Sequence, residues 1–179
     1  MPDPDINPDP DSAPRVLCIG AVLWDVIGRC DASMARGEGR PGRIRRLPGG
    51  VALNTARGLA GPGLHPVLLG AVGDDPEGAE LVAAAAAEGL DSAHLLRLPG
   101  HPTDRYLAVE DARGLVAAVA DARTLEAAGT AILAPLADGR LAGPGRLWDG
   151  PAVLDGNLPG HLLAVIAADA ALSHANLRL

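Results

Sequence analysis

The sequence predicts an α/β fold with a parallel sheet, from which a smaller β element projects. Two continuous apolar runs, VLCIGAV at 16–22 and PVLLGAVG at 66–73, are typical of strands buried on both faces of a parallel sheet. Segments with helical character alternate with these runs, beginning with VALNTARGLA at 51–60. The segment 28–47 and a hairpin-like stretch around 111–114 fall outside this alternation, so we expect them to form the projecting β element.

The boundaries of the other elements can be assigned from their end residues. The first strand ends close to Asp25. After the second strand, Asp75 is suited to cap a helix that starts at Pro76 and stops at Gly89. The remaining elements are a short strand near 95–98, two strand-like runs within 106–119, a strand at 151–155, a helix over about 161–174 and the start of a further strand at 176–179.

Composition and charge exclude several classes of protein. With 179 residues, 48% of them hydrophobic, the chain is long enough for one domain, which we place at 15–179. Residues 1–14 are rich in Pro and Asp and are predicted to form a disordered tail. The net charge of −7 does not favour nucleic acid as a partner. All basic residues are Arg, which excludes a Walker A loop, a Schiff-base lysine and a Ser-Lys pair.

No segment or residue cluster indicates a membrane, a disulfide or a metal site. No apolar run reaches the roughly 18 residues that span a bilayer, and the N-terminus lacks the order of a secretory signal. We therefore expect a cytoplasmic protein without a membrane partner. Cys18 and Cys30 lack the spacing of a disulfide framework, so two free thiols are expected. The five His are scattered, and we assign no metal ligand.

The most informative cluster combines Asp25 with the string GGVALN at 49–54. Two adjacent glycines, Gly49 and Gly50, leave backbone N–H groups uncovered at a helix start and allow a bulky ligand to come close. Asn54, one turn into the helix, offers a donor and an acceptor. Asp25 brings a carboxylate to the carboxyl end of a strand, where open α/β sheets bind ligands. The cluster suits a polyhydroxylated ring; the alternative is that the glycines form only a turn and Asp25 is only a loop carboxylate.

These segments resemble the ribokinase-like (PfkB) carbohydrate kinases over most of 15–170. The likeness rests on VLCIGAVLWDVIG, on LPGGVALNTARGLA with its GG-x-x-x-N signature, and on VLLGAVGDDPEGAEL. Within the family, TDRYLAVEDARGLVAAVAD at 103–121 and VLDGNLP at 153–159 look most like the pseudouridine kinases. The resemblance implies a ribokinase-like α/β fold, a three-layer parallel sheet with a small β lid formed by about 28–47 and 103–121.

The resemblance also implies an activity, ATP-dependent phosphorylation of a hydroxymethyl group on a sugar or nucleoside, with Mg²⁺. Asp25, Gly50 and Asn54 would hold the sugar. On the lid, Thr103, Arg105 and Tyr106 would face the nucleobase. The alternative is that they are exposed strand residues without such a role, which are commoner. Asn157 would lie near the meeting point of sugar and phosphate, or would instead cap the last helix.

The sequence departs from the family in one decisive respect. The family's second signature is a Gly-Ala-Gly-Asp at a helix N-terminus, which supplies the anion hole and the catalytic base. That string is absent, as are the Asn-x-x-Glu stretch associated with magnesium and the adenine-binding loops. We therefore expect a chain truncated before the nucleotide-binding half, with no catalytic residue of its own. A smaller departure is Pro62, which should shorten the first helix by a turn.

Three interpretations of the activity follow, and the sequence leaves open whether this chain acts as an enzyme. In the first, it is part of a kinase and is inactive alone, because phosphoryl transfer requires the missing groups. In the second, it is a non-catalytic sugar or nucleoside binder. In the third, it is an inert remnant whose exposed sheet edge favours dimerisation or aggregation. A homodimer through the lid or this edge is expected.

Overall fold

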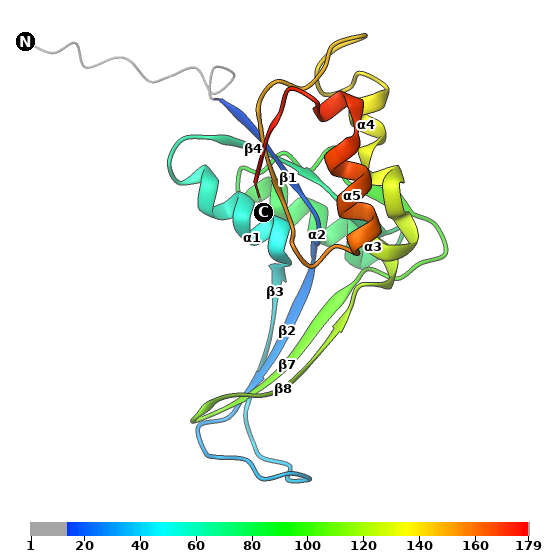
Figure 1. The fold of residues 1–179 in the computed structure, drawn as a ribbon. Coiled ribbons are helices and arrows are strands. Elements are labelled where there is room, and N and C mark those ends of the chain that lie inside the picture. The colour runs from blue at the N-terminus through cyan, green and yellow to red at the C-terminus, as the bar shows by residue number, and fades with distance from the viewer. Residues whose placement is uncertain (1–13, 179) are drawn as a thin grey trace, which may run out of the picture.

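The centre of the fold is a four-stranded parallel sheet, seen in a computed structural model that describes residues 14–178 (Figure 1). Its strands lie in the order β10 (Asn176–Arg178), β9 (Pro151–Leu154), β1 (Arg15–Ile19) and β4 (His65–Leu69), all paired in parallel. The predicted tail falls almost entirely on residues 1–13, which lie outside the described part of the chain. The second apolar run continues past Gly70 into β5 (Ala71–Gly73), which pairs with β6 (Leu96–Leu98) in a separate parallel sheet. The run predicted as one strand is therefore divided between two sheets.

Helices cover both faces of the central sheet and make three layers (Figure 1). One face carries α1 (Val51–Ala60) and α2 (Pro76–Ala87), and the other carries α3 (Arg123–Ala128), α4 (Ala134–Ala137), α5 (Gly160–Ala168) and two 3₁₀ turns, Gly129–Leu133 and Ala170–Leu172. Side chains of β1 alternate between the layers: Cys18 packs in the core beneath α1 and α2, whereas Leu17 and Ile19 pack in the core beneath α3 and α5. The three-layer α/β fold predicted from the sequence is confirmed.

A second four-stranded sheet projects from the core, and we name it the lid sheet (Figure 1). Its strands lie in the order β3 (Arg43–Gly49), β2 (Leu23–Arg29), β7 (Arg105–Asp111) and β8 (Gly114–Asp121). β2 pairs antiparallel with β3 and parallel with β7, and β7 forms a hairpin with β8. The sequence placed Asp25 just past the end of the first strand; the structure instead places it inside β2, because the chain leaves the core sheet after Ile19 and begins a new strand at Leu23.

The helix boundaries follow the local signals with one exception. Asp75 caps α2 by accepting a hydrogen bond from the Gly78 amide at 2.7 Å, with Pro76 next to it. α1 ends at Ala60, two residues before Pro62. The helix predicted over 161–174 was too long: α5 ends at Ala168, and Asp169 turns to extended backbone and caps the following 3₁₀ turn. Within residues 14–178, no helix is long and apolar enough to cross a membrane.

Candidate binding site

A cavity of about 870 Å³ lies where the lid sheet meets the core. Five of the residues expected from the sequence line it: Asp25, Gly50, Asn54, Tyr106 and Asn157. They come from β2, the start of α1, β7 and the loop after β9, so segments far apart in the chain converge at one place. The volume falls within the range of cavities that bind small molecules.

Asp25 places a carboxylate on the cavity side of the lid sheet. It lies opposite Tyr106 in β7 and Leu47 in β3, and residues opposite one another share a face of the sheet. Burial raises the pKa of Asp25, while the nearby Arg57 charge lowers it. Among residues 14–178, no group donates a hydrogen bond to this carboxylate, so it can accept hydrogen bonds from a ligand.

Gly49 and Gly50 are required by close packing at the start of α1. A Cβ atom at Gly49 would lie 2.1 Å from the Asp25 Oδ2 atom, so a side chain there would displace the carboxylate. Gly50 is the N-cap of α1 at φ 96°, and a Cβ atom there would lie 2.4 Å from the Ala21 carbonyl oxygen. Gly49 itself does not line the cavity; it makes room for Asp25.

Asn54 is held in one orientation by an arginine that the sequence analysis missed. Arg57 Nη1 donates to the Asn54 Oδ1 atom at 2.7 Å, and the rest of its guanidinium binds Glu88 at 2.6 and 2.9 Å. The Asn54 carbonyl is therefore occupied, and its NH₂ group is left as the donor for a ligand. The available signal was the spacing, because residues three apart are neighbours on a helix.

Asn157 lies beside a buried aspartate that was also missed. Asp155, 3% exposed, follows β9 directly and accepts hydrogen bonds from the Ala21 amide at 3.1 Å and the Asn157 amide at 2.8 Å. It thereby joins the loop after β1 to the loop after β9. The alternative that Asn157 caps the last helix is wrong, because the N-cap of α5 is Pro159 and no side chain caps it. A carboxylate directly after a buried strand was the signal for Asp155.

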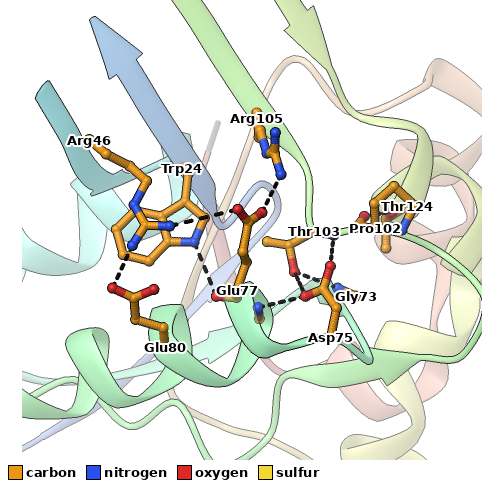
Figure 2. Close-up of polar contacts among 11 residues, drawn as sticks. Trp24, Arg46, Gly73, Asp75, Glu77, Glu80, Pro102, Thr103, Arg105 and Thr124 are labelled. Atoms are coloured by element: carbon orange, nitrogen blue, oxygen red, sulfur yellow. Dashed lines mark hydrogen bonds and ion pairs between the residues drawn. The ribbon is translucent and has the colours of Figure 1, made fainter. Parts of the chain in front are cut away.

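Neither Thr103 nor Arg105 lines the cavity. Both contact the start of α2, on the other side of the lid base (Figure 2). Thr103 is buried: its amide and hydroxyl donate to the Asp75 carboxylate at 2.8 and 2.6 Å, and its hydroxyl accepts from the Gly73 amide at 3.1 Å. Arg105 pairs with Glu77 in the first turn of α2. The expectation that these two residues face a nucleobase is therefore corrected, because strand alternation turns Arg105 away from the face that carries Tyr106.

The same side of the lid base carries a polar cluster that we name the lid anchor, consisting of Trp24, Arg46, Arg105, Glu77 and Glu80 (Figure 2). The Trp24 indole donates to the Glu77 carbonyl at 3.1 Å, and Arg46 pairs with both glutamates while its guanidinium lies 4.1 Å from the centre of the Trp24 ring. The anchor ties β2, β3 and β7 to α2. It thus fixes the lid sheet on the core from the side opposite the cavity.

The rim of the cavity at the start of α3 carries three charged residues that the sequence analysis did not select: Asp121, Arg123 and Glu126. Arg123 Nε and Nη2 donate to the two carboxylate oxygens of Asp121 at 2.8 and 2.7 Å. The forked geometry is typical of a strong arginine–carboxylate pair. No sequence motif indicated this pair, because its place at the cavity depends on how the hairpin returns to the core.

Comparison with known proteins agrees with this fold. Residues 13–135 match the family described as pfkB family carbohydrate kinase. The chain is 42% identical over 94 residues to the bifunctional protein HldE of Hyphomonas neptunium, covering 50% of this chain and 19% of that protein. It is 36% identical over 99 residues to the pseudouridine kinase of Escherichia coli, covering 55% of this chain and 32% of that protein. A putative sugar kinase from Clostridium perfringens superimposes with a TM-score of 0.69 at 24% identity, over 93% of this chain and 51% of that one.

The fold and the cavity at the lid base define a ribokinase-like α/β protein. With the family match over more than half of its length, the chain belongs to the pfkB family of carbohydrate kinases. It spans 19% and 32% of the two curated relatives and about half of the solved structure.

Proposed function

We propose that the cavity binds the sugar of a small carbohydrate or nucleoside and that the chain supplies the sugar side of an ATP-dependent kinase acting on a hydroxymethyl group. The observation that carries this proposal is the meeting of three groups at one cavity. They are the carboxylate of Asp25, free of hydrogen bonds from residues 14–178, the α1 start opened by Gly50, and the NH₂ group of Asn54. Acceptor, open backbone and donor together match the hydroxyls of a sugar ring.

Each residue has a distinct part in this proposal. Asp25 accepts hydrogen bonds from two neighbouring hydroxyls, and Asn54 donates to a third oxygen. Gly50 lets the ring approach the helix start. Tyr106, opposite Asp25 on the same face, lies where a nucleobase would extend along the lid sheet, and Asn157 borders the other side of the cavity. The similarity to a pseudouridine kinase supports a nucleoside as the ligand.

ATP and Mg²⁺ enter the proposal through the family alone. Among residues 14–178, no group of three or more His, Cys, Asp or Glu side chains is arranged to hold a metal ion, and we assign no Mg²⁺ ligand to this chain. The 179 residues also contain no Gly-Ala-Gly-Asp string. We therefore assign binding and orientation of the sugar to this chain and no proton or phosphoryl transfer step. In a coupled ADP-release assay, we expect the isolated chain to show no turnover above background; measurable turnover would contradict this assignment.

Two further parts of the proposal concern the partner and the compartment. A second copy is proposed to pack on the lid sheet, where Ile44 and Leu107 share a face and are 80% and 50% exposed; the core sheet edge at β10 is the other candidate surface. Leu107→Glu should reduce the mass measured by light scattering from that of a dimer to that of a monomer, and a monomeric wild-type chain would contradict the pairing.

The compartment proposed for the chain is the cytoplasm. The buried, unpaired Cys18 and Cys30 suit its reducing conditions.

Titration calorimetry with pseudouridine and ribose tests the binding site. We expect saturable binding that Asp25→Asn and Asn54→Ala each weaken by about tenfold or more, since each variant removes a hydrogen bond to the ligand worth roughly 1.5 kcal/mol. Asp31→Asn is the matched control, because Asp31 is an exposed aspartate outside the cavity. Binding that is absent in the wild type, or equal in all three variants, would contradict the proposed site.

A further inference from the structure

Charged side chains are unevenly distributed around the cavity. Four acidic residues line it: Asp25, Asp121, Glu126 and Asp155. Among the lining residues in the described part of the chain, Arg123 alone carries a positive charge. The residues of the lining therefore carry four negative formal charges and one positive charge.

That one positive charge is already engaged. Arg123 Nε and Nη2 donate to Asp121 Oδ1 and Oδ2 at 2.8 and 2.7 Å, so the planar guanidinium is turned toward a carboxylate of the same chain. The cation beside Asp25 is engaged too: Arg57 binds both Asn54 and Glu88. The carboxylates of Asp25, Glu126 and Asp155 have no comparable arginine partner within residues 14–178.

We propose that the cavity selects uncharged polyols, such as a free sugar or nucleoside, against their phosphorylated counterparts, and that the Asp121–Arg123 pair determines this specificity. The inference rests on the proposed function, because it names the class of ligand at the same cavity. Neutral hydroxyls donate to the carboxylates without a charge penalty. A phosphate would be repelled by the acidic residues of the lining. It would also have to displace Asp121 from Arg123, the one cation among the described lining residues.

The chain offers a matched control for the pair. Asp121 and Arg123 are two residues apart, and so are Asp138 and Arg140. The ion pairs have similar lengths, 2.7 Å and 2.8 Å, but the Asp138–Arg140 pair lies away from the cavity. Asp121→Asn removes the charge that holds Arg123 and leaves the guanidinium available to an anionic ligand. Asp138→Asn makes the same chemical change at the other pair.

The test is titration calorimetry of the full chain with ribose, ribose 1-phosphate and ribose 5-phosphate, so that the phosphate is presented at either end of the sugar. For the wild type, we expect ribose to bind about tenfold tighter than either phosphate, and we expect this ratio to narrow as the salt concentration rises. Asp121→Asn should reduce the ratio by about tenfold, and Asp138→Asn should leave it unchanged.

Each contrary result has a separate meaning. If the wild type bound neither ribose nor pseudouridine, the proposed function and this inference would both be overturned. If it bound ribose but bound a ribose phosphate equally well or tighter, charge selection would be overturned and the proposed function would stand. If Asp121→Asn and Asp138→Asn gave the same ratio as the wild type, the role of the Asp121–Arg123 pair would be overturned.

Discussion

Neighbouring residues at the base of the lid sheet have contrasting surroundings on its two faces. On the cavity face, the Asp25 carboxylate receives no hydrogen bond from the described residues, whereas on the anchor face Trp24 and Arg105 are both bonded to Glu77 (Figure 2). Alternation along β2 and β7 separates the two sets, since Trp24 precedes Asp25 and Arg105 precedes Tyr106. One face thus stabilises the lid, and the other keeps polar groups free for a ligand.

The largest loss of stability is expected where the anchor side meets the core. Asp75→Ala should lower the free energy of unfolding by about 3 kcal/mol, because it removes a helix cap worth about 1 kcal/mol and two hydrogen bonds from Thr103 worth about 1 kcal/mol each. Urea unfolding measures the change. The neighbouring, exposed Asp74 gives the control: Asp74→Ala should change stability by less than about 0.5 kcal/mol. Equal losses in the two variants would show that the network around Asp75 contributes little.

A smaller loss is expected at the start of α1, on the cavity side. Gly50→Ala should cost about 2 kcal/mol, because Gly50 has φ 96° and a Cβ atom would lie 2.4 Å from the Ala21 oxygen. Gly58→Ala, within the same helix and with no atom near the added Cβ, should instead be neutral or stabilising. Thermal unfolding of the two variants checks this difference, and a Gly50→Ala variant as stable as Gly58→Ala would contradict the account of the helix start.

Loosening the lid anchor should have a modest effect. Glu77→Gln weakens two exposed ion pairs, with Arg46 and Arg105, so we expect a loss of at most about 1 kcal/mol that disappears at high salt. Hydrogen exchange should be faster in β3 and β7, the strands joined to α2 through the Glu77 carboxylate. Glu110→Gln is the control, since its pair with Arg29 spans 3.7 Å within the lid sheet and does not reach α2. Unchanged exchange in Glu77→Gln would argue against an anchoring role.

The two faces should also respond oppositely to pH. Burial raises the pKa of Asp75, but hydrogen bonds from Thr103 and Gly78 and the Arg105 charge together lower it below its ordinary value of 3.8. Its contribution to stability is therefore present above that value and lost as the pH falls through the lower pKa of the folded state. The pKa of Asp25 is raised, so its contribution is present below the ordinary value and is lost as the pH rises.

Comparison of Asp75→Asn and Asp25→Asn with the wild type across acidic pH measures this contrast. The stability difference between wild type and Asp75→Asn should shrink as the solution becomes more acidic. The stability of Asp25→Asn relative to the wild type should increase as the pH rises through the titration of Asp25. The same pH trend in both variants would remove the electrostatic distinction between the two faces.

The fold could be predicted largely from local signals. Apolar runs without alternation identified the buried strands, and Asp75, Pro76 and Pro62 marked helix ends because caps and prolines act on their own neighbours. The division of 66–73 between two sheets was missed, since a continuous apolar run carries no record of which sheet each residue joins. The placement of Asp25 within β2 was also missed, because the apolar run at 16–22 does not show that the chain leaves the core sheet after Ile19.

The candidate site could be predicted only in part. Gly50 and Asn54 belong to a helix start that the pattern locates, and the structure brings them to one cavity with Asp25. Arg105 was misplaced because the face of a strand residue is fixed by pairing register, which the hairpin sequence alone does not set. Thr103 was misplaced because it precedes β7 and its hydrogen bonds to Asp75 and Gly73 join distant parts of the chain. Arg57, Asp155 and the Asp121–Arg123 pair act through contacts across long sequence distances or at the rim, and these depend on tertiary packing.

A crystal structure of the chain with pseudouridine bound tests the central claim most directly. The account predicts the ribose ring between the Asp25 carboxylate and the first turn of α1, with hydroxyl oxygens about 3 Å from Asp25 and from the Asn54 NH₂ group. A cavity filled by side chains, or a ring bound elsewhere with Asp25 left free, would contradict it.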